Sequence, residues 1–323
     1  SMELVVHGLR NGQLETLHPC SAVVIDVPYG KTLLSVGPDL ATFWRSASKP
    51  FQLLTSLAHL DRSTVDSLDD CDLALGAASH SGQASHVLRV RALLDRFGLK
   101  ESQLQCGASA PMHEPTARSL TQYQVAMNNC SGKHTFMLAA SQQQGWPLDY
   151  RDPAHPLQVK NRAAVDAYAG NPHGVGIDGC SIPTFHGPLS GQARAWAQIA
   201  GAMAAGPSAK GDDAMSRLGR IGWAMHKHPF FMSGNGRLDL SVVTRASEPL
   251  TVKIGAEGLF CIARPGASQG IAIKVHSGVS EALGPAVRAV MARMGVTFSG
   301  RLPGESVRNV RGVVVGERKA CWG

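Results

Sequence analysis

The chain has 323 residues, 44% of them hydrophobic, which is enough to bury a substantial core in one large domain or two closely packed ones. The formal net charge is +7 and the pI is near 9.2, but the basic residues are scattered. The densest basic group lacks interleaved aromatic side chains, which argues against nucleic-acid binding. No apolar run reaches membrane-spanning length and no signal-peptide pattern precedes Glu3, so we expect a cytoplasmic protein without a membrane partner.

The seven cysteines are spread widely along the chain. An odd number of cysteines without a signal peptide predicts reduced thiols rather than a disulfide framework. No pair shows zinc-finger spacing, so most of them are expected to be small buried hydrophobic residues.

The beginning of the chain predicts an antiparallel sheet followed by a helix. Residues 4–6, 22–26 and 32–36 are predicted strands, with a turn at 28–30 before the last one. Apolar side chains recur at helical spacing over 51–60, which predicts a helix that begins near Ser46.

The rest of the chain divides into a helical middle and a β-rich end. Helical periodicity is predicted at about 87–98, 135–144, 156–168, 189–204 and 213–226, with an irregular segment at 106–129 and turn chemistry without a period at 175–183. An antiparallel meander at 250–253, 258–263 and 270–275 is followed by a predicted helix at 279–294 and an edge strand at 313–315.

Ser46 and Lys49 lie three residues apart at the start of a predicted helix. On a helix they share one face, and the serine lies at the positive end of the helix dipole. A serine hydroxyl is a weak nucleophile, and a lysine can act as its base if burial or a neighbouring cation keeps the amine neutral. A capping serine beside a surface lysine fits the same spacing, so the pair alone leaves both interpretations open.

The order of the elements favours the catalytic interpretation. Strands, a Ser-x-x-Lys helix, a helical middle, a meander and a closing helix follow one another as in the serine β-lactamases and penicillin-binding enzymes, which the chain resembles in this order and in a late Lys-x-Gly. Here Lys253 opens the meander, and Ser79 and Ser81 lie between the two lysines in sequence. We therefore expect two Ser–Lys pairs in one cleft, Ser46 with Lys49 and Ser79 with Lys253.

A second group of residues has the chemistry of a metal site. Cys130 and Lys133 precede a predicted helix, and Cys180 lies in a distant glycine-flanked turn. Two thiolates and one neutral amine suit zinc and leave a fourth position for water, although the spacing by itself favours buried structural cysteines. His134 and Asp178 are candidates for groups beside these ligands.

Five motifs taken together resemble those of the rhizobial-type L-asparaginases, also called the class 3 or asparaginase II group. In chain order the matching stretches are Arg45-Ser46-x-x-Lys49-Pro50, Ser79-His80-Ser81-Gly82, Asn129-Cys130-Ser131-Gly132-Lys133-His134, Asp178-Gly179-Cys180-Ser181-Ile182-Pro183 and Lys253-x-Gly-x-Glu-Gly258. The resemblance runs from about residue 5 to 315.

The resemblance implies an α/β (α+β) fold of the serine β-lactamase/glutaminase type, with an antiparallel sheet, flanking helices and a helical subdomain. Residues 1–323 are then one catalytic unit, with its sheet part at about 3–45 and 235–320 and its helical part at about 60–230. It also implies a homodimer that hydrolyses L-asparagine to L-aspartate and ammonia.

The resemblance assigns catalysis to four residues, with the second serine being Ser79 or, because the serines alternate, Ser81. The implied catalytic residues are Ser46, Lys49, Ser79 and Lys253. The implied substrate-binding residues are Arg45, His134 and Asp178, and the implied zinc ligands are Cys130, Lys133 and Cys180. We expect Ser46 to be the nucleophile, with Ser79 as the alternative nucleophile or as a proton relay.

Two other functional classes remain open from the sequence. One is a glutaminase or β-lactam-active serine hydrolase on the same fold. The other is a non-catalytic protein that binds a metal or an amino acid and releases no ammonia.

Overall fold

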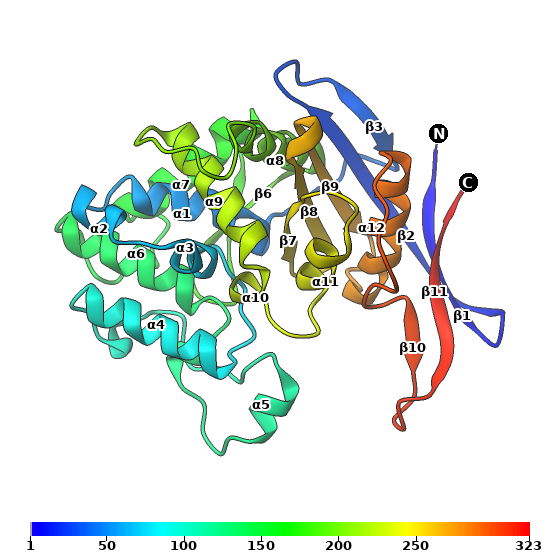
Figure 1. The fold of residues 1–323 in the computed structure, drawn as a ribbon, viewed down its shortest axis with the longest axis horizontal. Helices are drawn as coiled ribbons and strands as arrows, with labels where there is room; N and C mark the ends of the chain where they lie inside the picture. Colours follow the sequence, from blue (N-terminus) through cyan, green and yellow to red (C-terminus); the bar gives the residue numbers. More distant parts are fainter. Residues whose placement is uncertain (1) are drawn as a thin grey trace.

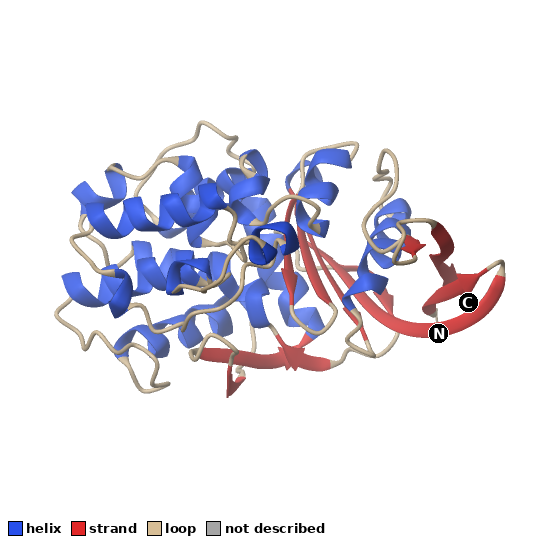
Figure 2. Ribbon diagram, turned by 90° about the horizontal axis from the view of Figure 1, so that it is seen from below, coloured by secondary structure: helices blue, strands red, loops and turns tan. Residues whose placement is uncertain are grey.

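An antiparallel sheet forms one side of the molecule and helices form the other, as Figures 1 and 2 show for the computed structural model, which describes residues 2–323. The sheet order is β10-β11-β1-β2-β9-β8-β7, and β3 also pairs with β2. The strands that were predicted at the beginning of the chain and in the meander are present, with these bounds: β1 (Leu4–Arg10), β2 (Gln13–Asp26), β3 (Thr32–Val36), β7 (Thr251–Gly255), β8 (Leu259–Arg264) and β9 (Gln269–Val275).

Strand β2 joins the two ends of the chain into one sheet because it is long enough for several neighbours. Its first part pairs with β1 and its last part pairs with β9 on one side and β3 on the other. Cys20 lies where the two parts meet, opposite Leu4 and opposite Val275. Figure 2 shows the curvature of this strand.

The last strand corrects the prediction of a short edge strand at 313–315. Strand β11 (Val314–Trp322) lies inside the sheet between β10 (Ser306–Arg308) and β1, with Trp322 opposite Leu4. The two ends of the chain therefore lie side by side (Figure 1). Only the first residues of β11 carry a β-branched signal, because they are followed by Gly316 and the charged residues Glu317, Arg318 and Lys319.

All of the longer predicted helices are present. They are α4 (Ala84–Arg96), α6 (Ser131–Gln143), α7 (Pro156–Ala169), α8 (Leu189–Met203), α9 (Ala214–Lys227) and α12 (Leu283–Arg293). Shorter helices complete this part of the molecule: α1 (Lys49–Leu57), α2 (Arg62–Asp66), α3 (Asp70–Gly76), α5 (Glu114–Arg118), α10 (Pro229–Met232) and α11 (Leu238–Arg245). Within residues 2–323, no helix has the length and apolar character needed to cross a membrane.

Helix α8 connects the sheet to the segment that carries Ser46. It packs closely on β9 at Gly270, where a Cβ atom would lie 2.1 Å from the backbone nitrogen of Ala197. The indole nitrogen of Trp196 on the same helix donates to the carbonyl of Ala47 at 3.1 Å. Burial of this helix therefore fixes the position of the Ser46 turn relative to the sheet.

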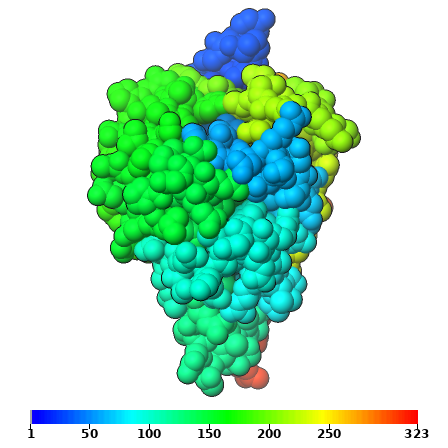
Figure 3. Space-filling model, turned by 90° about the vertical axis from the view of Figure 1, so that its left-hand side faces the viewer, coloured from blue at the N-terminus to red at the C-terminus, as the bar shows by residue number. Residues whose placement is uncertain are grey.

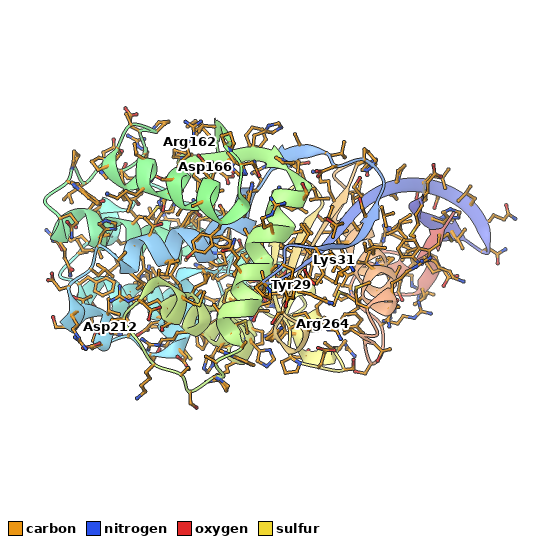
Figure 4. All side chains as sticks on the ribbon, turned by 90° about the horizontal axis from the view of Figure 1, so that it is seen from above. Tyr29, Lys31, Arg162, Asp166, Asp212 and Arg264 are labelled. Atoms are coloured by element: carbon orange, nitrogen blue, oxygen red, sulfur yellow. The ribbon has the colours of Figure 1, made fainter. Side chains whose placement is uncertain are left out.

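A second, small sheet corrects the prediction of turns without a period at 175–183. It has the order β4-β6-β5, from β4 (Ala41–Phe43), β5 (Gly174–Ile177) and β6 (Pro183–Pro188). Arg162 and Asp166, which Figure 4 labels on α7, hold His173 just before β5, and the Asp166 carboxylate lies 2.8 Å from the ring nitrogen Nδ1. Glycine and proline in strands this short leave no alternating pattern for sequence reasoning to detect.

The view from the helical side shows where the chain projects outward. In Figure 3 the β2–β3 hairpin projects at the top in blue, and the region of α5 projects at the bottom in green-cyan. The motif residues lie between these projections, where the helical part meets the edge of the sheet at β7.

Candidate active site

The hydroxyl of Ser79 lies between two lysine amines. Its Oγ is 2.8 Å from Lys49 Nζ and 2.8 Å from Lys253 Nζ. Lys49 comes from the first turn of α1, Ser79 follows α3, and Lys253 lies on β7. Three segments that are distant in the sequence thus converge on one oxygen atom.

Both lysines are completely buried, and neither forms an ion pair with a carboxylate in the described chain. Burial lowers the pKa of Lys253 well below its usual value; the charge of Asp239 opposes this shift, and the charges of Lys49 and Arg237 add to it. Burial also lowers the pKa of Lys49, against the opposing charge of Cys130. A neutral amine beside a serine hydroxyl is the arrangement that general-base catalysis requires.

Ser46 occupies a different environment from Ser79. It is half-buried, in a 3₁₀ turn (Arg45–Ser48) that leads directly into α1. Among residues 2–323 the Ser46 hydroxyl has no hydrogen-bond partner, so the expected contact between Ser46 and Lys49 is not formed in this structure. Arg45, the residue before it, adopts a left-handed conformation with φ of 46°, which is rare for a residue other than glycine and is typical of functional sites.

Ser81, the alternative to Ser79, points elsewhere. Its hydroxyl accepts a hydrogen bond from Arg237 Nη1 at 3.1 Å, and its backbone N–H donates to the carbonyl of Ser233 at 2.8 Å. The alternation of side chains along this segment separates the two serines, and the structure brings only Ser79 to the lysines.

The three predicted metal ligands are also brought together. Lys133 Nζ lies 3.6 Å from Cys180 Sγ, and Lys49 Nζ lies 3.3 Å from Cys130 Sγ. A hydrogen bond from the Cys180 thiol is the largest cause that holds the pKa of Cys130 well below its usual value, while the same bond and burial raise the pKa of Cys180 well above it. The two sulfur atoms and the amine form one buried cluster.

This donor set fits a zinc ion. Two soft sulfur ligands and one amine provide three of the four tetrahedral positions, and all three side chains are buried. Within the described chain no three side chains of the types His, Cys, Asp and Glu are grouped as metal ligands, so a three-ligand site here depends on the amine of Lys133. Burial lowers the pKa of Lys133, but the charges of Cys180 and Cys130 raise it more, so zinc must displace a proton from this amine.

Two of the three predicted substrate-binding residues form an ion pair. Arg45 Nε lies 2.9 Å from Asp178 Oδ1, and both side chains are partly accessible to solvent. Burial raises the pKa of Asp178, but the charges of Lys133 and Arg45 lower it more, and the net shift is downward. The pairing of β4 with β6 brings the turn after β5, which contains Asp178, next to Arg45.

His134, the third predicted substrate-binding residue, lies in the interior with no exposed surface. Its Nδ1 is 2.7 Å from the hydroxyl of Tyr150, and its Nε2 has no partner among the described residues. Burial and the nearby charges of Lys133 and Lys49 hold the pKa of His134 well below its usual value, so the ring is neutral. It is beside the metal-ligand cluster, and its contact with substrate stays a prediction.

Sequence reasoning missed two charged residues that contact this site. Arg237 Nη1 donates to the carbonyl of Ser79 at 2.9 Å, and Asp239 is fully buried and accepts a hydrogen bond from the backbone N–H of Ile254. Their segment contains Gly234 and Gly236 with positive φ, followed by a charged residue that is buried in α11. The available signal in the sequence was the acidic residue Asp239 placed between the apolar residues Leu238 and Leu240.

Comparison with known proteins identifies the family. A family model described as L-asparaginase II matches residues 6–320, nearly the whole chain. No curated protein gives a significant match. Among solved structures, one entitled "Crystal Structure Analysis of Mglu in its native form" is 14% identical with a TM-score of 0.48, and the match covers 87% of this chain and 65% of that one.

Proposed function

The chain belongs to the L-asparaginase II family of amidohydrolases, and on this premise we propose that it hydrolyses L-asparagine to L-aspartate and ammonia. The observation that carries the proposal is the placement of the Ser79 hydroxyl 2.8 Å from each of two buried lysine amines. Two buried amines on one hydroxyl are costly to the fold and favour proton transfer at neutral pH.

In the proposed reaction Ser46 is the nucleophile. It is the more accessible of the two serines, and it follows the left-handed Arg45. Its Oγ attacks the side-chain amide carbon of asparagine, and the hydroxyl proton passes to Lys49. Catalytic hydrogen bonds are often long without substrate, so the absence of a Ser46–Lys49 bond here is compatible with this role.

Ser79 is proposed to relay protons between the lysines. The amide nitrogen leaves as ammonia after it receives a proton, and the serine carries an aspartyl ester. A water molecule then adds to the ester carbonyl, loses its proton to the amine pair, and the C–O bond to serine breaks to release aspartate. Because Ser79 contacts both amines, it provides a path by which the proton taken in one step is returned in the next.

Arg45 and Asp178 are proposed to bind the charged end of the substrate, since they are the partly exposed opposite charges beside Ser46. Zinc bound by Cys130, Lys133 and Cys180 would supply an open fourth coordination position that orients the α-amino or α-carboxylate group. No proton transfer in this scheme requires the metal.

The finer assignments of fold and assembly belong to the same proposal. The antiparallel sheet with a Ser-x-x-Lys helix and Lys253 on β7 supports a serine β-lactamase/glutaminase-like architecture in one catalytic unit. A homodimer is what the family resemblance implies. The proposed cytoplasmic location is supported by the seven cysteines, which are all free thiols, as a reducing compartment favours.

The deciding experiment measures ammonia release from asparagine, glutamine and a chromogenic cephalosporin by the purified protein. We expect release from asparagine and trapping of an ester on the Ser46 peptide in mass spectrometry. Preferential turnover of glutamine or the cephalosporin would assign a different substrate to the same site. Binding of asparagine without any release of ammonia would contradict the enzymatic proposal.

A further inference from the structure

Asp239 is a buried carboxylate next to Lys253 that the proposed reaction does not use. It lies in the first turn of α11 with no exposed surface. Its Oδ2 accepts a hydrogen bond from the backbone N–H of Ile254 at 3.0 Å, and its Oδ1 has no partner among the described residues. A buried, half-satisfied carboxylate is costly, so its presence needs a reason.

The backbone of Ile254 connects Asp239 with Lys253 through two successive peptide groups. The Ile254 N–H donates to Asp239, and the Ile254 carbonyl accepts a hydrogen bond from Lys253 Nζ at 3.0 Å. Strand β7 is the last in the sheet order, so no further strand is available on its outer side to pair with the backbone of Ile254. The carboxylate of Asp239 takes that place, and it thereby sets the direction in which the amine points.

Asp239 is also the acidic residue among the charges around this amine. The other titratable groups that face Lys253 are Lys49 on α1, Arg237 before α11, Cys130 before α6 and Cys261 on β8. Two of these are cations, which disfavour a protonated Lys253. The charge of Asp239 opposes these cations, although Asp239 and Lys253 form no direct ion pair among the described residues.

We propose that Asp239 is a positioning residue for Lys253, because it fixes the backbone of Ile254 that holds the amine toward Ser79. The negative charge of Asp239 also favours the protonated form of the amine. A lysine that is too weak a base cannot take the proton of Ser79, and one that is permanently charged cannot accept it. The carboxylate of Asp239 keeps the proton affinity of Lys253 between these two extremes. The effect of Asp239 on kcat rests on the proposed function, whereas its effect on the proton affinity of the Lys253 amine does not.

The test therefore observes the lysine directly. The protein is labelled with ¹³C at lysine Cε, and the Lys253 signal, identified by its loss in Lys253→Met, is followed by NMR from neutral to alkaline pH. In Asp239→Asn, which retains an oxygen that can accept from Ile254, we expect the titration midpoint of Lys253 to fall by about 1 pH unit. Superimposable titrations of wild type and Asp239→Asn would overturn the electrostatic part of the proposal.

A second variant tests whether Asp239 orients the Lys253 amine. Asp239→Leu removes the acceptor as well as the charge, so we expect a lower kcat than in Asp239→Asn with little change in KM. Equal kcat values in the two variants would overturn the positioning part. Glu248→Gln is the matched control, because Glu248 pairs with Arg264 away from this site and its loss should leave the midpoint unchanged. A shifted midpoint in a protein that releases no ammonia would refute the proposed function but leave this inference standing.

Discussion

At the scale of single residues, Ser46 and Ser79 differ in two properties: Ser46 is the more accessible to solvent, and Ser79 is the one that contacts the lysines. Ser46 is half-buried and has no hydrogen-bond partner in the described chain, whereas Ser79 is 3% exposed and contacts both lysines. A nucleophile must reach the substrate, and a relay must touch the groups between which it moves protons. These two requirements assign different roles to the two hydroxyls.

The first prediction separates these roles. Ser46→Ala should lower turnover by about 10⁴-fold or more and abolish the aspartyl ester, because no other group replaces a covalent nucleophile. Ser79→Ala should lower turnover by about 10²- to 10³-fold, the usual contribution of an assisted proton transfer, and still form the ester on Ser46. Steady-state kinetics and mass spectrometry of the acylated peptide measure both.

Ser81→Ala is the control for this pair, since Ser81 faces Arg237 and should stay within tenfold of wild type. Formation of the ester on Ser79 in the Ser46→Ala variant would reverse the assignment.

The second prediction concerns the pH dependence of catalysis. The pKa of Lys253 is held well below its usual value mainly by burial. The neutral, active form should therefore predominate at a lower pH than for a free lysine, whose pKa is about 10.4. We expect kcat/KM to rise from neutral toward alkaline pH with an apparent pKa below that value. A profile that is flat or falling over this range would exclude a neutral lysine as the base.

At the scale of elements, the start of α6 and the turn between β5 and β6 build the metal-ligand cluster. Cys130 precedes the first residue of α6 and Lys133 lies in its first turn, while Cys180 is in the turn after β5. The left-handed Ser181, with φ of 76°, closes that turn. Neither element holds two sulfur ligands by itself, so the cluster exists only if both are in place.

The third prediction is a zinc content of about one ion per chain after growth in zinc-replete medium. Cys130→Ala and Cys180→Ala should each lose the metal, and occupancy should fall at acid pH because the thiols and the amine must be deprotonated to bind. Cys261→Ala is the control, because this buried thiol lies on β8 and contacts Gln192 on α8 rather than the proposed ligands.

Elemental analysis measures these contents, and kinetics should show that metal loss raises KM more than it lowers kcat. Wild-type protein without zinc, or both mutants with full occupancy, would leave the two cysteines as ordinary core residues.

The fourth prediction tests the contact between α6 and α3. A Cβ on Gly132 would lie 2.2 Å from the backbone carbonyl of Leu75, and neither backbone can move away independently. Gly132→Ala should therefore destabilise the protein by about 1–3 kcal/mol, as overpacking does in other cores. Gly179→Ala is the control, because the space around Gly179 is open, and its effect should be near zero. Urea unfolding measures both, and equal midpoints for the two variants would contradict the packing argument.

At the scale of the whole molecule, the groups to which we assign catalysis lie where the helical part meets the sheet. Lys49 and Ser79 come from the helical side and Lys253 from β7, and burial of all three depends on both parts being folded together. The molecule places two lysines in its interior at a cost in stability, since buried amines lose their hydration. Such a cost is typical of sites built for chemistry.

The fifth prediction follows from this cost and has a defined sign. The pKa of Lys253 is lower in the folded protein than in the unfolded chain, so the unfolded chain binds more protons between these two values and wild-type stability falls as the pH drops through that window. Lys253→Met removes this dependence. The midpoint of unfolding of the variant relative to wild type should be highest near neutral pH and should decrease toward about pH 10.

Thermal unfolding at a series of pH values measures this difference, and Lys319→Met, a change on β11 outside the site, is the control. Parallel curves for wild type and Lys253→Met would show that burial does not affect the proton affinity of this amine.

Local sequence patterns were sufficient for several parts of this protein. Helical periodicity located α4, α7, α8 and α9, and β-branched runs between turns located the meander, because these signals depend on neighbours within a few residues. The resemblance of the five motifs to the asparaginase II group, rather than their spacing alone, pointed to the lysines and cysteines that the structure brings together.

Other features required the tertiary structure, because they depend on residues that meet only after the chain folds. Ser79 and Lys253 are separated by 174 residues in the sequence, and only the fold distinguishes Ser79 from Ser81 by the direction of its side chain. The small sheet that joins Asp178 to Arg45 has strands too short and too rich in glycine and proline to leave a pattern. The roles of Arg237 and Asp239 depend on hydrogen bonds to backbone groups, which any residue offers and which no sequence motif records.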